Sequence, residues 1–560
     1  EQYAFYFEDT WKVTSRLTLN IGVRYDWSTP GMEATNKNVK FDPRFPNPVG
    51  LLSGPNTGGG TVNDALGHPV LGAYIFADSA ELPTRRVTAI DRSNLAPRLG
   101  FAYKLNPKTV IRGGVAKLYW LTTYRALFSP STNPFSAKTA VVGTVDGINP
   151  NVSITNIFPN GIAPPVGAAR GPLTDVGGSL SGGTGGQKNP YSWQWNFGFQ
   201  RELPANSLLT VSYLGSQGRR LACPFFFCGS GVGQDVLQQY GSSLLDEVPN
   251  PFFGLTDPSG RLNTGLNLIT QETVQRKQLL TEWPAFNYGG SIYIPPPASK
   301  AGFDIFKEEY PFQNRWHGVT VGLEKRYSDG LQAMIALTTG RSLTNADSFE
   351  AGYLGPVAGT QQSRDLTLEK SLSAEDTSYR LAISHVYDLP LGRGHRLGNG
   401  WHPALDAIAG GWEVSGILSF QSGFPLPIST AVNNINNGWG TPRPNMSGTP
   451  SVNSGSRGAR VQQWIGPDAF SQPADFSYGN APRLLNGARA DGVKNFDFSL
   501  IKFFKISEDV NLEFRAEFFN LFNRPQFAIP NMGWGSATFG QVTGTTGPPR
   551  YTQLALKFNF

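Results

Sequence analysis

Apolar and polar residues alternate with a period of two along much of the chain, most clearly near its end. The apolar set there is Leu512, Phe514, Ala516, Phe518, Leu554, Leu556, Phe558 and Phe560, and the polar set is Glu513, Arg515, Glu517, Gln553, Lys557 and Asn559. Successive side chains on a β-strand point to opposite faces, so this period predicts strands with one apolar and one polar face.

The same alternation recurs along the whole sequence and predicts an all-β fold of about thirteen antiparallel strands. The expected strands are about 3–13, 17–27, 97–105, 109–120, 191–202, 207–217, 312–327, 331–343, 376–388, 411–422, 495–505, 512–518 and 551–560. Short connectors, such as the turn at Asp329-Gly330, alternate with long ones. Asp-Gly between two alternating runs is a strong signal for a hairpin.

The solvent on the apolar side distinguishes a soluble sandwich from a membrane barrel. The strands are about ten residues long, enough to cross a bilayer at a tilt and longer than the usual strands of soluble sheets. Their polar faces carry full charges, which suits a wet lumen better than a dry core. Together with the alternation of short and long connectors, these features predict a transmembrane antiparallel β-barrel with long extracellular loops.

Composition supports a single barrel over residues 1–560. Only 39% of the residues are hydrophobic, although aromatic residues reach 12%, and the mean hydropathy is −0.25. No apolar run approaches the roughly 18 residues of a transmembrane helix. The net charge is +6, but Lys and Arg are scattered and form no basic helix, so nucleic-acid binding is not expected.

Several stretches resemble TonB-dependent outer-membrane receptors, and most closely the Oar-like subgroup with a carboxypeptidase-regulatory-like domain. Residues 495–505 (NFDFSLIKFFK), 512–527 (LEFRAEFFNLFNRPQF) and 554–560 (LALKFNF) are similar to the closing strands of these receptors. Residues 3–25 (YAFYFEDTWKVTSRLTLNIGVRY) and 411–425 (GWEVSGILSFQSGFP) resemble earlier strands.

The resemblance implies the C-terminal part of a barrel of about 22 strands, truncated at the N-terminus and without its plug domain. It further implies location in the bacterial outer membrane, contact with membrane lipid, and import of an unknown ligand powered by a TonB-type protein that acts through the plug. The ligand would be a carbohydrate, a peptide or a metal chelate. The terminal Phe558 and Phe560 resemble the signal that the barrel-assembly machinery reads.

No residue pattern predicts an enzyme, a catalytic residue, a metal site or a cofactor. The histidines lack ligand spacing, and the glycine cluster at 177–186 lacks the Lys and Ser/Thr of a phosphate-binding loop. Glu513 and Glu517 share a face with Arg515 between them, which favours a charge ladder in the lumen over acid–base chemistry.

The long loops contain the candidate binding residues. Trp283, Phe286, Tyr288 and Tyr293 lie in an aromatic, proline-rich tract, where they either stack on a sugar or peptide ligand or pack the loop. Cys223 and Cys228 are the only cysteines. A disulfide within one exposed loop is favoured over a pair of free thiols.

Two other classes of function stay open on the sequence alone. A surface adhesion or assembly protein would use the same barrel without ligand uptake. A soluble all-β binding protein would show polar outer faces and would need no detergent. Because about thirteen strands are only part of the larger barrel that the resemblance implies, we expect an open, curved sheet with 3–13 and 551–560 as its unpaired edges.

We predict that Phe560 is required for membrane insertion. Deletion of Phe560 from the full-length protein should lower the amount of folded, heat-modifiable barrel in outer-membrane fractions by at least about twofold, because the terminal aromatic strand would no longer carry its signal. An unchanged amount would mean that Phe560 only anchors the strand at the interface.

Overall fold

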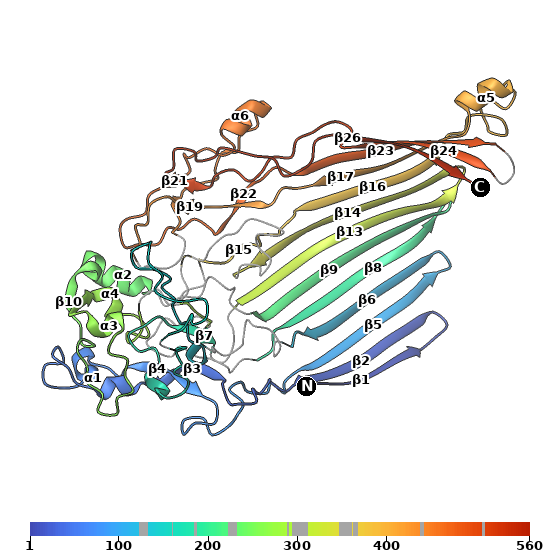
Figure 1. Ribbon diagram of the computed structural model, residues 1–560. Helices are drawn as coiled ribbons and strands as arrows, with labels where there is room; N and C mark the ends of the chain where they lie inside the picture. Colours follow the sequence, from blue (N-terminus) through green and yellow to red (C-terminus); the bar gives the residue numbers. More distant parts are fainter. Residues whose placement is uncertain are drawn as a thin grey trace.

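The computed structural model of the chain describes residues 1–121, 133–159, 161–183, 188–221, 232–287, 291–293, 312–345, 361, 368–436, 442–506 and 510–560. Most of the strand residues belong to one curved antiparallel sheet, and the long connections gather at one end of it (Figure 1). No helix among the described residues has the length and hydropathy needed to span a membrane.

The main sheet contains 14 strands, and its order follows the sequence except for the short β15, which pairs with β14. In order, its strands are β1 (Gln2–Lys12), β2 (Leu17–Ser28), β5 (Leu95–Asn106), β6 (Thr109–Tyr119), β8 (Tyr191–Leu203), β9 (Ser207–Leu221), β13 (Phe312–Ser328), β14 (Leu331–Thr344), β16 (Tyr379–Asp388), β17 (Trp412–Gln421), β23 (Val493–Lys505), β24 (Asn511–Phe519) and β26 (Tyr551–Asn559), with β15 at Ser371–Leu372. Each strand range expected from the alternation falls on one of these strands.

Short turns join the strands at one end, which we call the turn end. Between β13 and β14, Asp329 and Gly330 have φ values of 53° and 77°. Two successive positive φ values are those of a type I′ turn, whose twist matches the twist of the flanking strands. The connector from β16 to β17 is longer and contains α5 (Pro403–Ala409).

The two edges of the main sheet are β1 and β26. Among the described residues, β1 pairs only with β2 and β26 only with β24, so the barrel is not closed. The edges expected at 3–13 and 551–560 are therefore confirmed. Both edge strands run toward the turn end, away from the long connections (Figure 1). The larger barrel of about 22 strands stays a prediction.

The register keeps apolar and polar residues on opposite faces across the sheet. Phe514 pairs with Leu556, whereas Glu513 pairs with Lys557, and directly paired residues share a face. The face of Phe514, here called the apolar face, carries most of the large exposed hydrophobic residues of the long strands, including Leu556 and Phe558. The predicted separation of Phe514, Phe518, Leu556 and Phe558 from Glu513, Arg515 and Lys557 is confirmed.

The alternation breaks down near the turn end of β23, where Lys502 pairs with Phe514 on the apolar face. Lys502 is nevertheless buried, because its Nζ donates to the carbonyl of Gly410 and lies 5.5 Å from the ring centroid of Trp412. The α5 connector thus accommodates a charge that would otherwise face hydrocarbon.

At the other end, here called the loop end, the long connections fold into a layer of short elements. These are β3 (Val39–Pro46), η1 (Pro48–Leu51), α1 (Val62–Leu66), β4 (Leu71–Phe76), η2 (Asn133–Phe135), η3 (Gly171–Leu173), β7 (Ser181–Gly183), α2 (Gln234–Tyr240), η4 (Gly241–Leu245), β10 (Glu247–Pro249), α3 (Asn267–Thr270), β11 (Thr273–Gln275), α4 (Arg276–Leu279), β12 (Ser291–Tyr293), β18 (Pro425–Pro427), β19 (Ser429–Thr430), β20 (Asn445–Met446), α6 (Arg457–Gln462), β21 (Phe470–Ser471), β22 (Leu484–Arg489) and β25 (Gly533–Trp534).

The loop layer has hydrophobic cores of its own. Phe41 and Tyr74 of the β2–β5 connection and Phe252 and Trp283 of the β9–β13 connection are buried in one cluster. A second cluster joins Leu426 and its neighbours to Met532 and Val542. The loops therefore support one another through side chains that are far apart in the sequence.

A buried ion pair also ties the loop layer together. The side chains of Arg443 and Glu369 are 1% and 0% exposed, and Arg443 Nη1 lies 2.9 Å from Glu369 Oε2. Gln361 completes the network, since its Oε1 accepts from the Arg443 backbone and its own backbone N–H donates to Glu369.

We predict that Glu369→Gln loosens this layer. Removing one partner leaves the guanidinium of Arg443 buried without its counter-charge, which costs about 3–5 kcal/mol. Trypsin should cleave the loops of the full-length protein on intact cells faster than in the wild type.

The control is Asp246→Asn, because the Asp246–Arg276 pair is 3.7 Å long with side chains that are 56% and 37% exposed. The Asp246→Asn variant should lose less than about 1 kcal/mol of stability, and trypsin should cleave its loops as slowly as those of the wild type. Replacing both members of the buried pair, as Glu369→Leu with Arg443→Met, should restore most of the resistance. Equal cleavage of the Glu369→Gln variant and the wild type would contradict the prediction.

Candidate functional site

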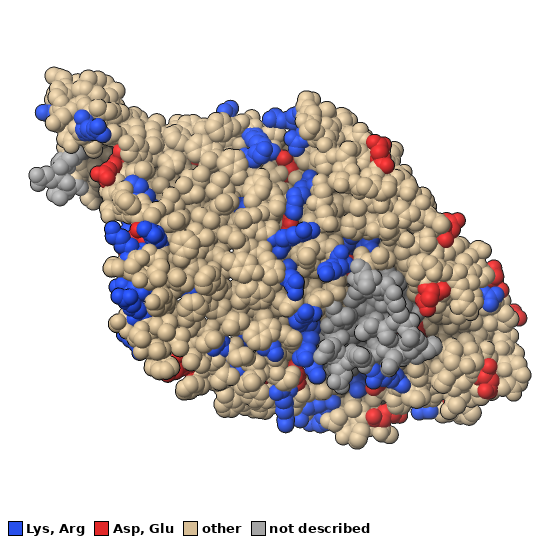
Figure 2. All heavy atoms as spheres, turned by 180° about the vertical axis from the view of Figure 1, so that it is seen from behind, with Lys and Arg blue, Asp and Glu red and all other residues tan. Residues whose placement is uncertain are grey.

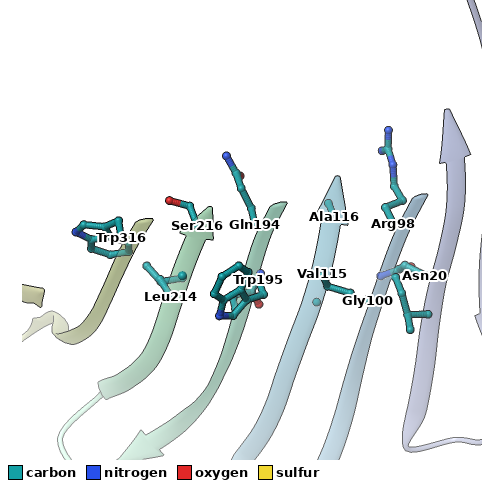
Figure 3. Close-up of a pocket in the computed structure, with 14 residues that line it drawn as sticks. Asn20, Arg98, Gly100, Val115, Ala116, Gln194, Trp195, Leu214, Ser216 and Trp316 are labelled. Atoms are coloured by element: carbon teal, nitrogen blue, oxygen red, sulfur yellow. The ribbon is translucent and has the colours of Figure 1, made fainter. Parts of the chain in front are cut away.

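A hollow of about 480 Å³ lies on the polar face of the sheet, opposite the apolar face, between β2 and β13 (Figure 3). Its lining combines amide and hydroxyl side chains with one cation and the indole rings of Trp195 and Trp316. The lining side chains on the polar face are Asn20, Arg98, Ala116, Gln194, Asn196, Leu214, Ser216 and Trp316, together with the glycines Gly100 and Gly114.

Two neighbouring cross-strand rows build this hollow. One row runs through Asn20, Gly100, Gly114, Asn196 and Leu214. The absence of side chains at Gly100 and Gly114 leaves space between the two asparagines. The hollow is therefore a consequence of register, because these residues meet only when each strand is paired as observed.

The second row carries Arg98 at one end and Trp316 at the other, with Gln194 and Ser216 between them (Figure 3). Arg98 Nη1 lies 3.3 Å from Glu8 Oε2 on β1. The ring of Trp316 lies over glycines of β13 and β14, since a Cβ at Gly318 or Gly340 would be 2.5 or 3.1 Å from its Cζ2.

The lining groups can bind a polar solute but are not arranged for acid–base chemistry. In the part of the chain that the structure describes, the side-chain amides of Gln194 and Asn196 make no hydrogen bond, so they can donate to and accept from a ligand or water. The one cation, Arg98, is paired with Glu8. No group of His, Cys, Asp and Glu that could hold a metal ion occurs among the described residues.

The predicted charge ladder lies farther along the polar face, on β24. Arg515 Nη2 lies 2.5 Å from Glu513 Oε1, and Arg515 Nη1 lies 3.6 Å from Glu517 Oε1. Both carboxylates are thus paired with the guanidinium between them, as the ladder requires. Nearby, a second hollow of about 500 Å³ is lined in part by Met334, Val386 and Ile417.

The structure does not bring Trp283 or Phe286 to the hollow. Trp283 and Phe286 are 4% and 2% exposed and belong to the core of the loop layer, where the ring of Phe41 meets both edge to face. Their burial fits the alternative that these two aromatics pack the loop, and a ligand role for them stays a prediction.

The other predicted residues have different outcomes. Tyr288, Cys223 and Cys228 lie outside the described residues, and for Tyr293 only the backbone pairing of β12 with β7 is described. The ligand and disulfide roles stay predictions for them. Phe558 lies on the apolar face, where it pairs with Leu512 of β24. The Phe560 side chain is 93% exposed.

The hollow is not predicted by the sequence, although part of its signal is present there. Gln194 and Asn196 alternate with tryptophans and so belong to a polar face. Their meeting with Asn20 and Trp316 depends on pairing across strands, which the period of a single strand does not specify.

Comparison with known families assigns the chain to its class. Residues 1–553 match the family described as outer membrane beta barrel domain, and the chain belongs to that family. Its location is therefore the bacterial outer membrane. No curated protein matches the chain.

Solved structures share a distant likeness over the whole chain. The siderophore receptor PirA from Acinetobacter baumannii is 12% identical with a TM-score of 0.39, and the chain covers 46% of it. The ferric-catecholate import receptor Fiu from E. coli K12 is 12% identical with a TM-score of 0.36 and 44% coverage. The copper transporter OprC is 11% identical with a TM-score of 0.36, and the chain covers 47% of it. The chain thus spans less than half the length of these proteins.

We predict that Gly318→Ala destabilises the barrel, whereas Gly322→Ala does not. A Cβ at Gly318 would lie 2.5 Å from Trp316 Cζ2 and 2.8 Å from the Thr339 carbonyl oxygen, and such overpacking costs about 1–3 kcal/mol. At Gly322, on the same strand and face, the nearest atom is 3.9 Å away. The heat-modifiability temperature of the full-length protein should fall only for Gly318→Ala, and equal temperatures for the two variants would contradict the packing of Trp316.

Proposed function

We propose that this chain is part of a TonB-dependent receptor of the Oar-like kind that imports a ligand across the outer membrane. The observation that carries the proposal is the hollow on the polar face, where unpaired amides, a cation and an indole ring converge on open space. A barrel that served only as a surface anchor would have no need of such a lining. The sequence resemblance to TonB-dependent receptors supports the same assignment.

The loop layer would capture the ligand and deliver it to the polar face. Its packed cores hold it together, so it can present a defined surface above the lumen. In the proposed cycle, a TonB-type protein acts on a plug domain within the barrel, and the ligand then moves along the polar face. The barrel-assembly machinery would insert the protein by reading the strand that ends at Phe560.

The lining favours a neutral, hydroxyl-rich ligand such as an oligosaccharide. Side-chain amides of Asn and Gln match hydroxyl groups as donors and acceptors, and an indole ring stacks on the apolar face of a sugar. We propose that the protein binds and transports this ligand without chemical change, because the lining provides hydrogen bonds and one paired cation but no nucleophile and base.

Uptake by cells that express the full-length protein tests the proposal. A deletion strain and an expressing strain would be fed a mixture of oligosaccharides, oligopeptides and ferric chelates, and depletion of each solute from the medium would be followed by mass spectrometry. We expect faster depletion of oligosaccharides by the expressing strain. A protonophore should abolish the difference, because import is energised from the inner membrane.

The solute that the expressing strain depletes indicates which class of function the protein has. Faster depletion of peptides or chelates in place of sugars would support import but contradict the proposed ligand class. Equal depletion of every solute by the two strains, with the protein folded in the membrane, would contradict import and favour a surface adhesion or assembly role.

A further inference from the structure

Basic side chains gather on the apolar face where the strands meet the loop layer. They are Lys117 of β6, Arg219 of β9, Arg315 of β13, Arg341 of β14 and Lys494 of β23, and they are here called the basic band. Figure 2 shows Lys and Arg in a stripe that crosses the molecule beside the loops. Arg315, Arg341 and Lys494 are exposed.

The arginines of the band are diagonal neighbours on three successive strands of the sheet. Arg315 pairs with Gln217 on one side and with Leu343 on the other. Arg219 and Arg341 lie two residues beyond those partners, so each is roughly 7–8 Å from Arg315 along the sheet. This spacing lets long side chains converge on one multivalent anion.

The carboxylates of the long strands lie on the opposite, polar face, with one exception. The Asp and Glu residues of the long strands that lie on the polar face are Glu8, Asp26, Glu202, Glu324, Asp388, Glu413, Asp497, Glu513 and Glu517. Asp9, on the edge strand β1, is the exception within the described strands. The charge on the apolar face near the loops is therefore of one sign.

Neutral groups hold the basic band in place but do not neutralise it. Lys117 Nζ lies 4.2 Å from the ring centroid of Tyr191 and 4.6 Å from that of Tyr119. Arg219 donates to the side-chain oxygen of Gln313, and Arg341 Nη2 lies 3.4 Å from Asn486 Oδ1. Within the described residues, no carboxylate forms an ion pair with any member of the band.

The location of the band indicates which anionic groups it can meet. In outer-membrane barrels the long loops are extracellular and aromatic girdles mark the interface with lipid headgroups. The band lies at that level on the face that meets lipid. Arginine binds phosphate through paired N–H donors, and basic side chains at a membrane surface are attracted to anionic headgroups.

We propose that the basic band is a binding surface for the phosphate groups of an anionic lipid in the outer leaflet. Arg219, Arg315 and Arg341 contact the phosphates, and Lys117 and Lys494 flank them. This surface is separate from the hollow on the polar face, so it fixes the barrel in its membrane whether or not the protein imports a ligand.

Lipid retention by the full-length protein tests the proposal. The protein would be placed in phosphatidylcholine nanodiscs doped with a bisphosphorylated glucosamine lipid or with the same lipid after removal of its phosphates. After extraction into mild detergent, retained lipid per protein would be measured by mass spectrometry. The wild type should retain at least about threefold more of the phosphorylated lipid, and inorganic phosphate should not displace it.

Matched variants distinguish lipid retention by the basic band from a general effect of positive charge. The variant Arg219→Gln, Arg315→Gln and Arg341→Gln should lose the preference, and lysine at the same positions should restore much of it. The control variant carries Arg16→Gln, Arg201→Gln and Lys325→Gln. It removes the same amount of charge at the turn end and should keep the preference for the phosphorylated lipid. Equal retention of the two lipids by the wild type would overturn the proposal, and this comparison does not depend on the folding of a variant. Equal loss of the lipid preference in the band and control variants would also overturn it.

Discussion

The structure depends on backbone hydrogen bonds that are made in one register across the main sheet. In the hydrocarbon of a membrane, an unpaired N–H or C=O group costs several kcal/mol, so each strand must be paired along its length. A slip by one residue would transfer every side chain of a strand to the opposite face. The continuity of the apolar face from Phe5 on β1 to Leu556 on β26 therefore reflects a register that holds across every pair between them.

The register also positions the features that bear on function. The hollow exists because glycines of β5 and β6 fall between Asn20 and Asn196 in one row. The basic band exists because Arg219, Arg315 and Arg341 lie on diagonal positions of adjacent strands. One constraint thus gives the sheet two chemically different surfaces, a polar face suited to solutes and an apolar face that meets lipid.

The strands could be predicted from the sequence because each one carries its own period, as in Phe514 and Phe518 against Glu513 and Arg515. The loop layer could not be predicted in this way. Phe41 and Trp283 are more than two hundred positions apart in the chain, yet their ring centroids lie 5.5 Å apart. Elements of two to eight residues are too short for a period. Packing between distant residues decides whether an aromatic side chain is buried or free to meet a ligand.

The two faces of the main sheet border different media, with water on the polar face and lipid on the apolar face. Spin labels attached in turn to cysteines at positions 319–324 of β13, in a full-length background with Cys223→Ser and Cys228→Ser, would measure this directly in lipid bilayers. The account predicts high accessibility to dissolved oxygen at 319, 321 and 323, where Val319, Val321 and Leu323 share the apolar face, and high accessibility to a water-soluble nickel chelate at 320, 322 and 324. The opposite phase, or no alternation along the strand, would contradict it.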